Sequence, residues 1–212
     1  MGEKCQWCSL MCALCRIGCY RCGQTLCCKE PAAPRPTYPV IAIGLSQAGK
    51  SLLCALLSAE TVTDELQPTV GFSVKAVQLP TAILNVKELG GGDNVRKYWS
   101  HYFEGALGVV YVVDSSSNDD DVDLAAAELK EALSHPSLET LPLLVLANKQ
   151  DVQGARSADE LSRMMGLDVI ARNREWHIQP CSKNDVEAAR QGLGKLVTFM
   201  CPEKQAVEEN RI

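Results

Sequence analysis

The 212-residue chain has few cysteines beyond its first 28 residues, few histidines and no long apolar run near its start. Only three of its 11 cysteines follow residue 28, which excludes a disulfide scaffold spread through the chain. Its three histidines, His101, His135 and His177, do not cluster and indicate no metal centre. The longest uncharged stretch of the N-terminal segment, residues 5–15, is shorter than the about 18 residues of a membrane span. It also lacks the small-residue cleavage site of a secretory signal.

The body of the chain also lacks a basic stripe. Residues 1–35 carry five basic and two acidic side chains, a local charge of +3, whereas the whole chain has a net charge of −5. The rest therefore carries −8. Because phosphate backbones are bound by clustered Lys and Arg, this acidic body argues against nucleic acid as a partner. A basic leader suits an anionic membrane surface instead.

Four prolines, at positions 31, 34, 36 and 39, mark a division of the chain. Proline cannot continue a helix and favours an extended spacer. We therefore expect a Cys-rich basic leader with a Pro-rich spacer at residues 1–37. A single globular domain should occupy residues 38–201, followed by a charged tail at residues 202–212.

Short apolar runs alternate with helical segments through the domain, which predicts an α/β fold with a parallel sheet covered on both faces. Two strand-like runs, 71–79 and 82–88, are separated by Pro80 and Thr81 and predict a hairpin that adds an antiparallel edge. The acidic run Asp119-Asp120-Asp121 should cap the helix expected at residues 121–133, an interpretation favoured over a calcium site. The other expected elements are strands at 40–44, 107–113 and 141–147 and helices at 50–58 and 184–200.

A phosphate-binding loop follows the first apolar strand. Residues 44–51 match the pattern G-x-x-x-x-G-K-S/T and precede a helix, as the motif requires. Backbone N–H groups of such a loop point at phosphate oxygens, while Lys50 would reach the β- and γ-phosphates and Ser51 would bind Mg2+. The predicted loop contacts are Gly44, Leu45, Ser46, Gln47, Ala48, Gly49, Lys50, Ser51 and Leu52.

The sequence Asn148-Lys149-Gln150-Asp151 indicates which base is bound. It follows a buried run, and open α/β sheets bind ligands at the carboxyl ends of their strands. The Asp151 carboxylate can accept hydrogen bonds from both N1 and N2 of guanine, a donor pair that adenine lacks. Asn148 would tie the loop together, and the stem of Lys149 would cover the ring. GTP and GDP are therefore the expected ligands.

These motifs, from about residue 38 to residue 200, resemble an Arf-like small GTPase of the Ras superfamily, and most of all a divergent branch of that group. The resemblance implies the P-loop small-GTPase fold, a mostly parallel six-stranded sheet with one antiparallel edge strand and helices on both faces. The matches that carry it, besides the two loops above, are the stretches at residues 67–72, 89–91, 93–99 and 112–115.

The resemblance also implies roles for residues outside the two loops. Thr69 would bind Mg2+ and the γ-phosphate in the first switch, and the Gly91 N–H would hold the γ-phosphate in the second. Glu88 would contact Mg2+ through water, beside Ser51 and Thr69. Cys181, Ser182 and Lys183 fill the loop that contacts the guanine O6, although an ordinary strand end before the last helix remains open there.

The second switch departs from the family pattern. Where relatives have W-D-x-G-G-Q, residues 87–92 are Lys-Glu-Leu-Gly-Gly-Gly. The glutamine orients the attacking water, and Gly92 has no side chain with which to do so. Glu88 is one methylene longer than aspartate, about 1.5 Å. We expect nucleotide binding with very slow hydrolysis. One alternative is that a partner supplies the missing water-positioning group. Another is that the protein is an adaptor that does not respond to nucleotide.

A switch of this kind works because the γ-phosphate orders two loops that partners recognise. Expected partners are effectors in trafficking or signalling, an exchange factor and a GTPase-activating protein. In the Arf family the hairpin between the switches also shifts register, which couples the nucleotide state to the N-terminal leader. The resemblance implies the same role for residues 71–88 here. The aromatic cluster Tyr98, Trp99, Tyr102 and Phe103 could anchor a partner, although core packing is expected for at least half of it.

Six leader cysteines repeat at spacings of three and four residues and would share one face of a helix. S-acylation is the favoured interpretation, and zinc binding and a structural core stripe are the alternatives. Two or more acyl chains would hold the protein on the cytosolic face of Golgi, endosomal or plasma membranes, with a cytoplasmic pool. Gly2 follows Met1, but Gln6 breaks the myristoylation motif. The candidate acylation sites are Cys5, Cys8, Cys12, Cys15, Cys19, Cys22, Cys27 and Cys28.

Overall fold

The computed structural model describes residues 35–58 and 69–201. The chain divides into two units, residues 1–35 and 36–212, and nearly all described residues belong to the second. The predicted leader, most of the spacer and the charged tail lie outside the described residues. So does the segment 59–68 before the first switch threonine.

The domain contains a six-stranded sheet with the strand order β2-β3-β1-β4-β5-β6. Only the pair β2 and β3 is antiparallel, and the other four pairs are parallel. The predicted mostly parallel sheet with one antiparallel edge strand is confirmed. The strands are β1 (Thr37–Ile43), β2 (Phe72–Gln78), β3 (Ile83–Leu89), β4 (Gly108–Asp114), β5 (Leu143–Asn148) and β6 (Trp176–Pro180).

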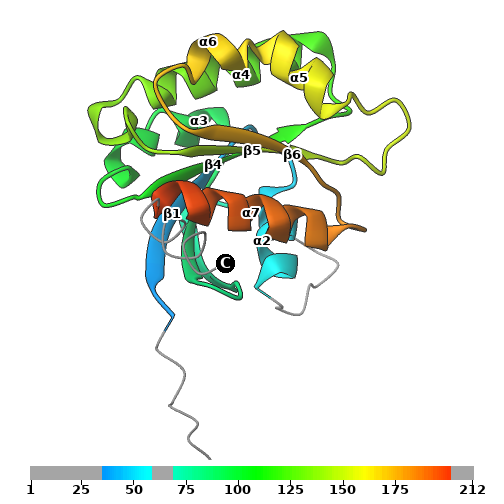
Figure 1. Ribbon diagram of the computed structural model, residues 1–212. Coiled ribbons are helices and arrows are strands. Elements are labelled where there is room, and N and C mark those ends of the chain that lie inside the picture. Colours follow the sequence, from blue (N-terminus) through cyan, green and yellow to red (C-terminus); the bar gives the residue numbers. More distant parts are fainter. Residues whose placement is uncertain (1–34, 59–68, 202–212) are drawn as a thin grey trace, which may run out of the picture. The chain divides into compact units, whose positions relative to one another are not determined.

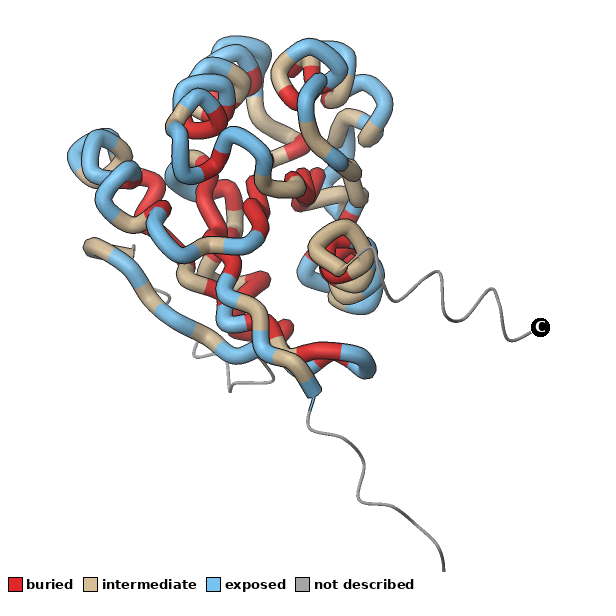
Figure 2. Tube along the Cα trace, turned by 60° about the vertical axis from the view of Figure 1, so that its left-hand side comes forward, coloured by how far each residue is buried: buried red, intermediate tan, exposed pale blue. Residues whose placement is uncertain are grey.

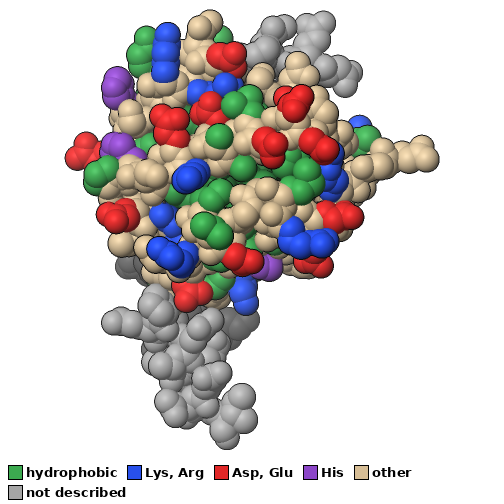
Figure 3. Space-filling view, turned by 90° about the horizontal axis from the view of Figure 1, so that it is seen from above, with side chains coloured by type: hydrophobic (Ala, Val, Ile, Leu, Met, Phe, Trp, Pro, Cys, Tyr) green, Lys and Arg blue, Asp and Glu red, His purple; other side chains and the backbone are tan. Residues whose placement is uncertain are grey.

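Helices cover both faces of this sheet, as predicted (Figure 1). The helices α2 and α7 lie on one face, and α3, α4, α5 and α6 lie on the other. Acidic and basic side chains are interspersed on the face that carries α4 to α6 (Figure 3). The helices are α2 (Lys50–Leu57), α3 (Asp93–Arg96), α4 (Asp119–Leu133), α5 (Ala158–Met165), α6 (Leu167–Ile170) and α7 (Val186–Met200), with 3-10 turns η1 (Trp99–Tyr102) and η2 (Pro136–Leu138).

Alternation along the strands divides the core into two layers. In β1, Ile41 and Ile43 pack with α4, whereas Val40 and Ala42 pack with α2 and α7. Successive side chains of a strand point to opposite faces, so a run that is buried throughout must have helices on both sides. Figure 2 shows the result, with the buried strands in the middle and the exposed residues on the surrounding elements.

The start of α4 corrects one prediction. The helix begins at Asp119, not at residue 121, because Asn118 is its cap and accepts a 2.7 Å hydrogen bond from the Asp121 N–H. The three aspartates therefore lie in the first turn of the helix and do not cap it from outside. In the first turn their negative charge interacts favourably with the helix dipole. The last helix similarly begins at Val186, since the Asp185 carboxylate accepts a hydrogen bond from the Ala188 N–H.

The predicted hairpin and several unpredicted helices complete the domain. In the hairpin Gln78 pairs with Ile83, and the Leu79 N–H donates to the Ala82 carbonyl across the Pro80-Thr81 turn. Sequence periodicity missed the short helices α3, α5 and α6, although α5 carries a capping box in which Ser157 and Glu160 bond each other's backbone N–H. Among the described residues, no helix has the length and apolarity needed to cross a bilayer.

Candidate functional site

The candidate site lies at the carboxyl end of β1, where residues 44–49 connect this strand to α2. A cavity of about 670 Å3 opens beside this loop. It brings together the predicted loop, the first switch threonine and the second switch. Its lining residues are Ser46, Gln47, Gly49, Lys50, Ser51, Leu52, Thr69, Val70, Glu88, Gly90, Gly91, Gly92, Asp93, Asn94 and Val95.

The loop conformation requires glycine at the two glycine positions of the motif. Gly44 has φ +148°, and a Cβ there would lie 2.3 Å from the Val112 carbonyl oxygen. Gly49 has φ +88°, and its Cβ would lie 2.4 Å from Asn148 Nδ2. Any side chain at either position would clash with the neighbouring strand ends. The backbone of the loop therefore lies close to the ends of β4 and β5.

Lys50 is the first residue of α2 and is 6% exposed. Its Nζ donates hydrogen bonds to the carbonyls of Gly44 (2.9 Å) and Leu45 (2.7 Å), so the ammonium group is held against the loop. Burial lowers the pKa of Lys50 to about 8, although the negative charge of Glu88 opposes this shift. An anion such as phosphate would restore the charge balance of this buried cation.

The three predicted metal ligands meet beside Lys50. Ser51 Oγ lies 3.0 Å from Thr69 Oγ1, and Glu88 Oε1 accepts hydrogen bonds from Ser51 Oγ and, at 3.3 Å, from Thr69 Oγ1. Adjacent ligands of an octahedral Mg2+ with bonds of about 2.1 Å lie about 3.0 Å apart. The hydroxyl pair has this spacing, and all donors are oxygen. The residues present therefore fit a magnesium ion.

The glycines of the second switch differ in what surrounds them. A Cβ on Gly91 would lie 2.4 Å from the Gly44 carbonyl oxygen and 2.5 Å from the Leu45 carbonyl carbon, so the Gly91 backbone lies directly against the loop. Gly92 has φ −72°, and nothing lies within 4 Å of the Cβ that could be added there. The position of the family's glutamine thus has both the space and the backbone conformation for a side chain.

Arg96, to which the sequence assigned no role, links this switch to α4. Its Nη1 donates to the Gly91 carbonyl (3.1 Å) and to Asp93 Oδ1 (2.7 Å), and its Nε donates to Glu128 Oε1 (2.9 Å). The only sequence signal was its place in the matching stretch 93–99. Such a bridge across 32 residues is visible only in the fold.

The aromatic cluster beyond the second switch divides between core and surface. Trp99 and Phe103 are buried, and Trp99 Nε1 donates to the Gly90 carbonyl at 2.9 Å. Tyr98 is exposed, and the Tyr102 ring packs against Phe72 with a centroid distance of 5.2 Å. The expectation that at least half of the cluster packs in the core is confirmed.

The base motif lies against the loop from the other side. Asn148 Nδ2 donates to the Ala48 carbonyl at 2.8 Å, the tie that the sequence predicted. Asp151 faces Asn184 Nδ2 at 3.5 Å and Lys183 Nζ at 3.9 Å. The Cys181 N–H donates to the Ala147 carbonyl, and the Gln150 N–H donates to the Cys181 carbonyl. The structure therefore brings the predicted residues 181–183 and the base motif together.

Two further features stabilise this end of the site. Lys149 adopts φ +65° and its Nζ pairs with Asp114 Oδ2 at 2.6 Å, a partner that the sequence did not identify. Burial raises the pKa of Asp114, but hydrogen bonds from Lys149 and Ser116 outweigh this and leave it lowered. Burial, with the charge of Asp185, raises the pKa of Cys181 to about 12, so its thiol stays protonated and unreactive.

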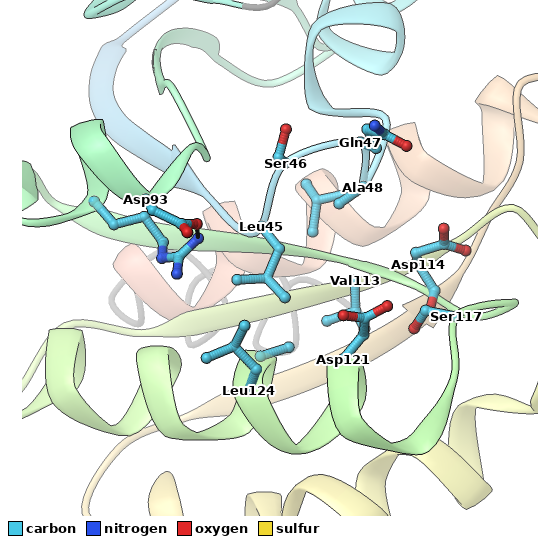
Figure 4. Close-up of a pocket in the computed structure, with 13 residues that line it drawn as sticks. Leu45, Ser46, Gln47, Ala48, Asp93, Val113, Asp114, Ser117, Asp121 and Leu124 are labelled. Atoms are coloured by element: carbon cyan, nitrogen blue, oxygen red, sulfur yellow. Dashed lines mark hydrogen bonds and ion pairs between the residues drawn. The ribbon is translucent and has the colours of Figure 1, made fainter.

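A second hollow of about 300 Å3 lies on the α4 side of the loop (Figure 4). Leu45 and Ser46 of the loop, Asp93 of the second switch, and Asp121 and Leu124 of α4 enclose it. The three predicted metal ligands, Ser51, Thr69 and Glu88, line the larger cavity and not this one. The larger cavity is therefore the place where a phosphate chain and its cation fit.

Comparisons with known proteins identify the family of the chain. Residues 32–200 match the model of the ADP-ribosylation factor family. The ADP-ribosylation factor-like protein 15 of Bos taurus is 48% identical over 181 residues, which cover 85% of this chain and 89% of the relative. The Homo sapiens protein of the same name is 47% identical, with coverages of 85% and 88%. It is this branch that the sequence of the switches resembled.

A solved structure shows the same fold. The Arl6 BBS3 small GTPase of Trypanosoma brucei, determined with the bound nucleotide analogue GppNp, aligns with a TM-score of 0.71. The alignment covers 79% of this chain and 99% of that chain at 22% sequence identity. At this identity the likeness concerns the fold alone.

Proposed function

Because the chain belongs to the ADP-ribosylation factor family, we propose that it is a membrane-associated guanine-nucleotide switch whose own GTP hydrolysis is very slow. The observation that carries the proposal is the convergence of Lys50, Ser51, Thr69 and Glu88 on one cavity. These side chains come from three separate segments of the chain. Together they supply the cation for phosphate and the oxygens for a metal.

Each part of the site has a role in this proposal. Lys50 and the loop N–H groups bind the β- and γ-phosphates, and Asp151 selects guanine. Ser51, Thr69 and Glu88 hold Mg2+, which neutralises phosphate charge when bound. Thr69 and Gly91 sense the γ-phosphate, since both border the cavity and Gly91 lies against the loop.

Slow hydrolysis follows from the second switch. A water-orienting group must lie beside the γ-phosphate, and Gly92 borders the cavity without a side chain. Gly91 and Lys50 remain in place beside it, so nucleotide binding should be retained although hydrolysis is slow. A GTPase-activating partner that contributes the missing group would restore hydrolysis without any change in this chain.

The surface that partners would read lies next to the nucleotide sensors. Val70, the neighbour of Thr69, is 91% exposed, and Phe72 and Val74 on β2 are also exposed. The Tyr102 ring packs against Phe72 and extends this apolar surface, and Tyr98 is exposed in the same segment after the second switch. Exposed apolar and aromatic side chains favour protein contacts. We therefore place effector and exchange-factor binding here.

Nucleotide titration and single-turnover hydrolysis test the proposal. Fluorescent GTP and GDP should bind the wild-type chain in the presence of Mg2+, and wild-type hydrolysis should be very slow. Gly92→Gln should accelerate it by about tenfold or more, because a positioned water-orienting group contributes at least this much. Gly92→Ala is the matched control, since it fills the same open space without a polar group.

The outcomes separate the candidate functions. A chain that binds neither nucleotide would be an adaptor that merely displays the fold. Wild-type hydrolysis as fast as that of a partner-stimulated GTPase would refute the claim of a lost catalytic group. Equal rates for Gly92→Gln and Gly92→Ala would show that Glu88 or the surrounding loop limits turnover as well.

A further inference from the structure

The carboxylate of Glu88 lies unusually close to the two hydroxyls that fit a cation. Its Oε1 contacts Ser51 Oγ directly and lies 3.3 Å from Thr69 Oγ1, while the hydroxyls are 3.0 Å apart. A bridging water would need a hydrogen bond of about 2.8 Å on each side. The three oxygens are too close to one another for that. The carboxylate and the two hydroxyls therefore form one cluster of oxygens, with no water between them.

The position of Glu88 is fixed by the sheet. Glu88 lies in β3 and is paired on both sides, with Ala42 of β1 and Ser73 of β2. Two ladders hold the backbone, so the reach of the carboxylate depends on the length of its side chain. An aspartate on the same backbone would withdraw its oxygens by about 1.5 Å, one C–C bond.

The charge of Glu88 also favours a cation in this place. The residue is 1% exposed, and no described Lys or Arg forms an ion pair with it. Burial lowers the pKa of Lys50 and the charge of Glu88 opposes this shift, but the Lys50 ammonium group donates its hydrogen bonds to the loop carbonyls and not to Glu88. A buried carboxylate is costly unless a positive charge shares its environment. Direct contact with a divalent ion provides that charge.

We propose that Glu88 coordinates the divalent cation of the bound nucleotide directly, in the place of one water molecule. The inference rests on the proposed nucleotide binding and concerns only how the cation is held. An anionic ligand in direct contact strengthens the hold on the cation. The change from aspartate to glutamate then replaces a water ligand of the cation by a carboxylate.

Counting the waters on the ion tests this directly. Mn2+ replaces Mg2+ in the complex of the full chain with GppNp, and broadening of its EPR lines by 17O-labelled water gives the number of bound waters. Ser51, Thr69 and two phosphate oxygens leave two of six positions in an octahedral ion. With Glu88 bound, the wild type should therefore retain one water. Glu88→Asp should retain two and bind Mn2+ more weakly.

Each result decides the inference. Two waters in the wild type would overturn it even if GppNp binds tightly. The wild-type count stands alone should Glu88→Asp fail to fold. Glu104→Asp, an exposed residue away from the cavity, is the control for the substitution itself and should match the wild type. Failure of the wild type to bind GppNp, measured first, would instead overturn the proposed function and with it this inference.

Discussion

At the scale of single residues, neighbouring glycines in the second switch have opposite meanings. Gly91 is required, because any side chain would strike the backbone of the phosphate loop. Gly92 is not required by the fold, because its backbone is ordinary and its surroundings are open. The missing glutamine is thus a chemical difference and not a steric one. This is why restoring the side chain is an informative experiment.

As the proposed phosphate ligand, Lys50 should make nucleotide binding depend on pH. Its pKa of about 8 means that the phosphate-binding charge is lost as pH rises through 8. If only the charged form binds, GDP affinity should fall about fourfold between pH 7.0 and pH 8.5, from the protonated fractions at this pKa. Titrations with fluorescent GDP in this range measure the effect. In Lys50→Arg, whose guanidinium stays charged, the affinity should not change with pH.

The same lowered pKa affects the free energy of unfolding in the opposite direction, since stability rises with pH where nucleotide affinity falls. The unfolded chain holds the Lys50 proton up to its ordinary pKa of 10.5, whereas the folded chain releases it near 8. The unfolded state therefore binds more protons between these values, and this group's contribution to the free energy of unfolding rises with pH there. A flat affinity profile for the wild type would show that Lys50 keeps its proton and contradict both statements.

At the scale of elements, Arg96 joins the second switch to α4. The pair of Arg96 with Glu128 is largely buried, with side-chain exposures of 12% and 21%, whereas Asp93 is 90% exposed. Buried charge-assisted hydrogen bonds contribute more than exposed ion pairs. Glu128→Gln should therefore lower the free energy of unfolding by about 1 to 2 kcal/mol. Asp93→Asn, which removes the exposed partner of the same arginine, should change it little.

Urea unfolding of the two variants and of Arg96→Ala measures this link. In a double-mutant cycle, Arg96→Ala should abolish most of the effect of Glu128→Gln, because both act through one contact. Additive losses would show that the two side chains stabilise the domain independently. The link would then not couple the switch to α4.

At the scale of the whole molecule, the chain combines a nucleotide domain with a segment proposed to bind membranes. The leader lies outside the described residues, so its role stays a prediction from sequence. One acyl chain holds a protein only marginally, at about 0.8 kcal/mol for each buried methylene, and several thiols are therefore expected to share the task. The six-cysteine stripe and the pair Cys27 and Cys28 offer more acylation sites than stable anchoring needs.

Replacing all eight leader cysteines by serine should move the protein from membranes to the soluble fraction. Membrane flotation, with thioester-specific acyl exchange on the full chain, measures both location and modification. Cys201→Ser is the control, because this thiol lies in the domain and contacts the Tyr38 hydroxyl. Unchanged flotation of the eight-serine variant would refute acylation. One stoichiometric zinc in the purified wild-type chain would favour the metal interpretation instead.

Much of the fold and site was predictable because the decisive signals are local. The glycine-lysine-serine pattern after an apolar run fixes the phosphate loop, and Asn148 to Asp151 follow a buried strand. Short helices such as α6 were missed, since four residues give no periodicity to detect. The α4 boundary was missed because Asn118, and not an aspartate, caps the helix.

The sequence by itself determined the order of the motifs along the chain, the prediction that Asp151 reads the base, and the absence of a side chain at Gly92. All of these depend on which residues follow one another along the chain. Only the tertiary structure decided that Glu88 contacts Ser51 and Thr69, that Lys149 pairs with Asp114, and that Arg96 reaches Glu128. Those contacts join residues 19 to 37 positions apart. They depend on strand register and side-chain length, which set the distances between atoms and leave no trace in local sequence.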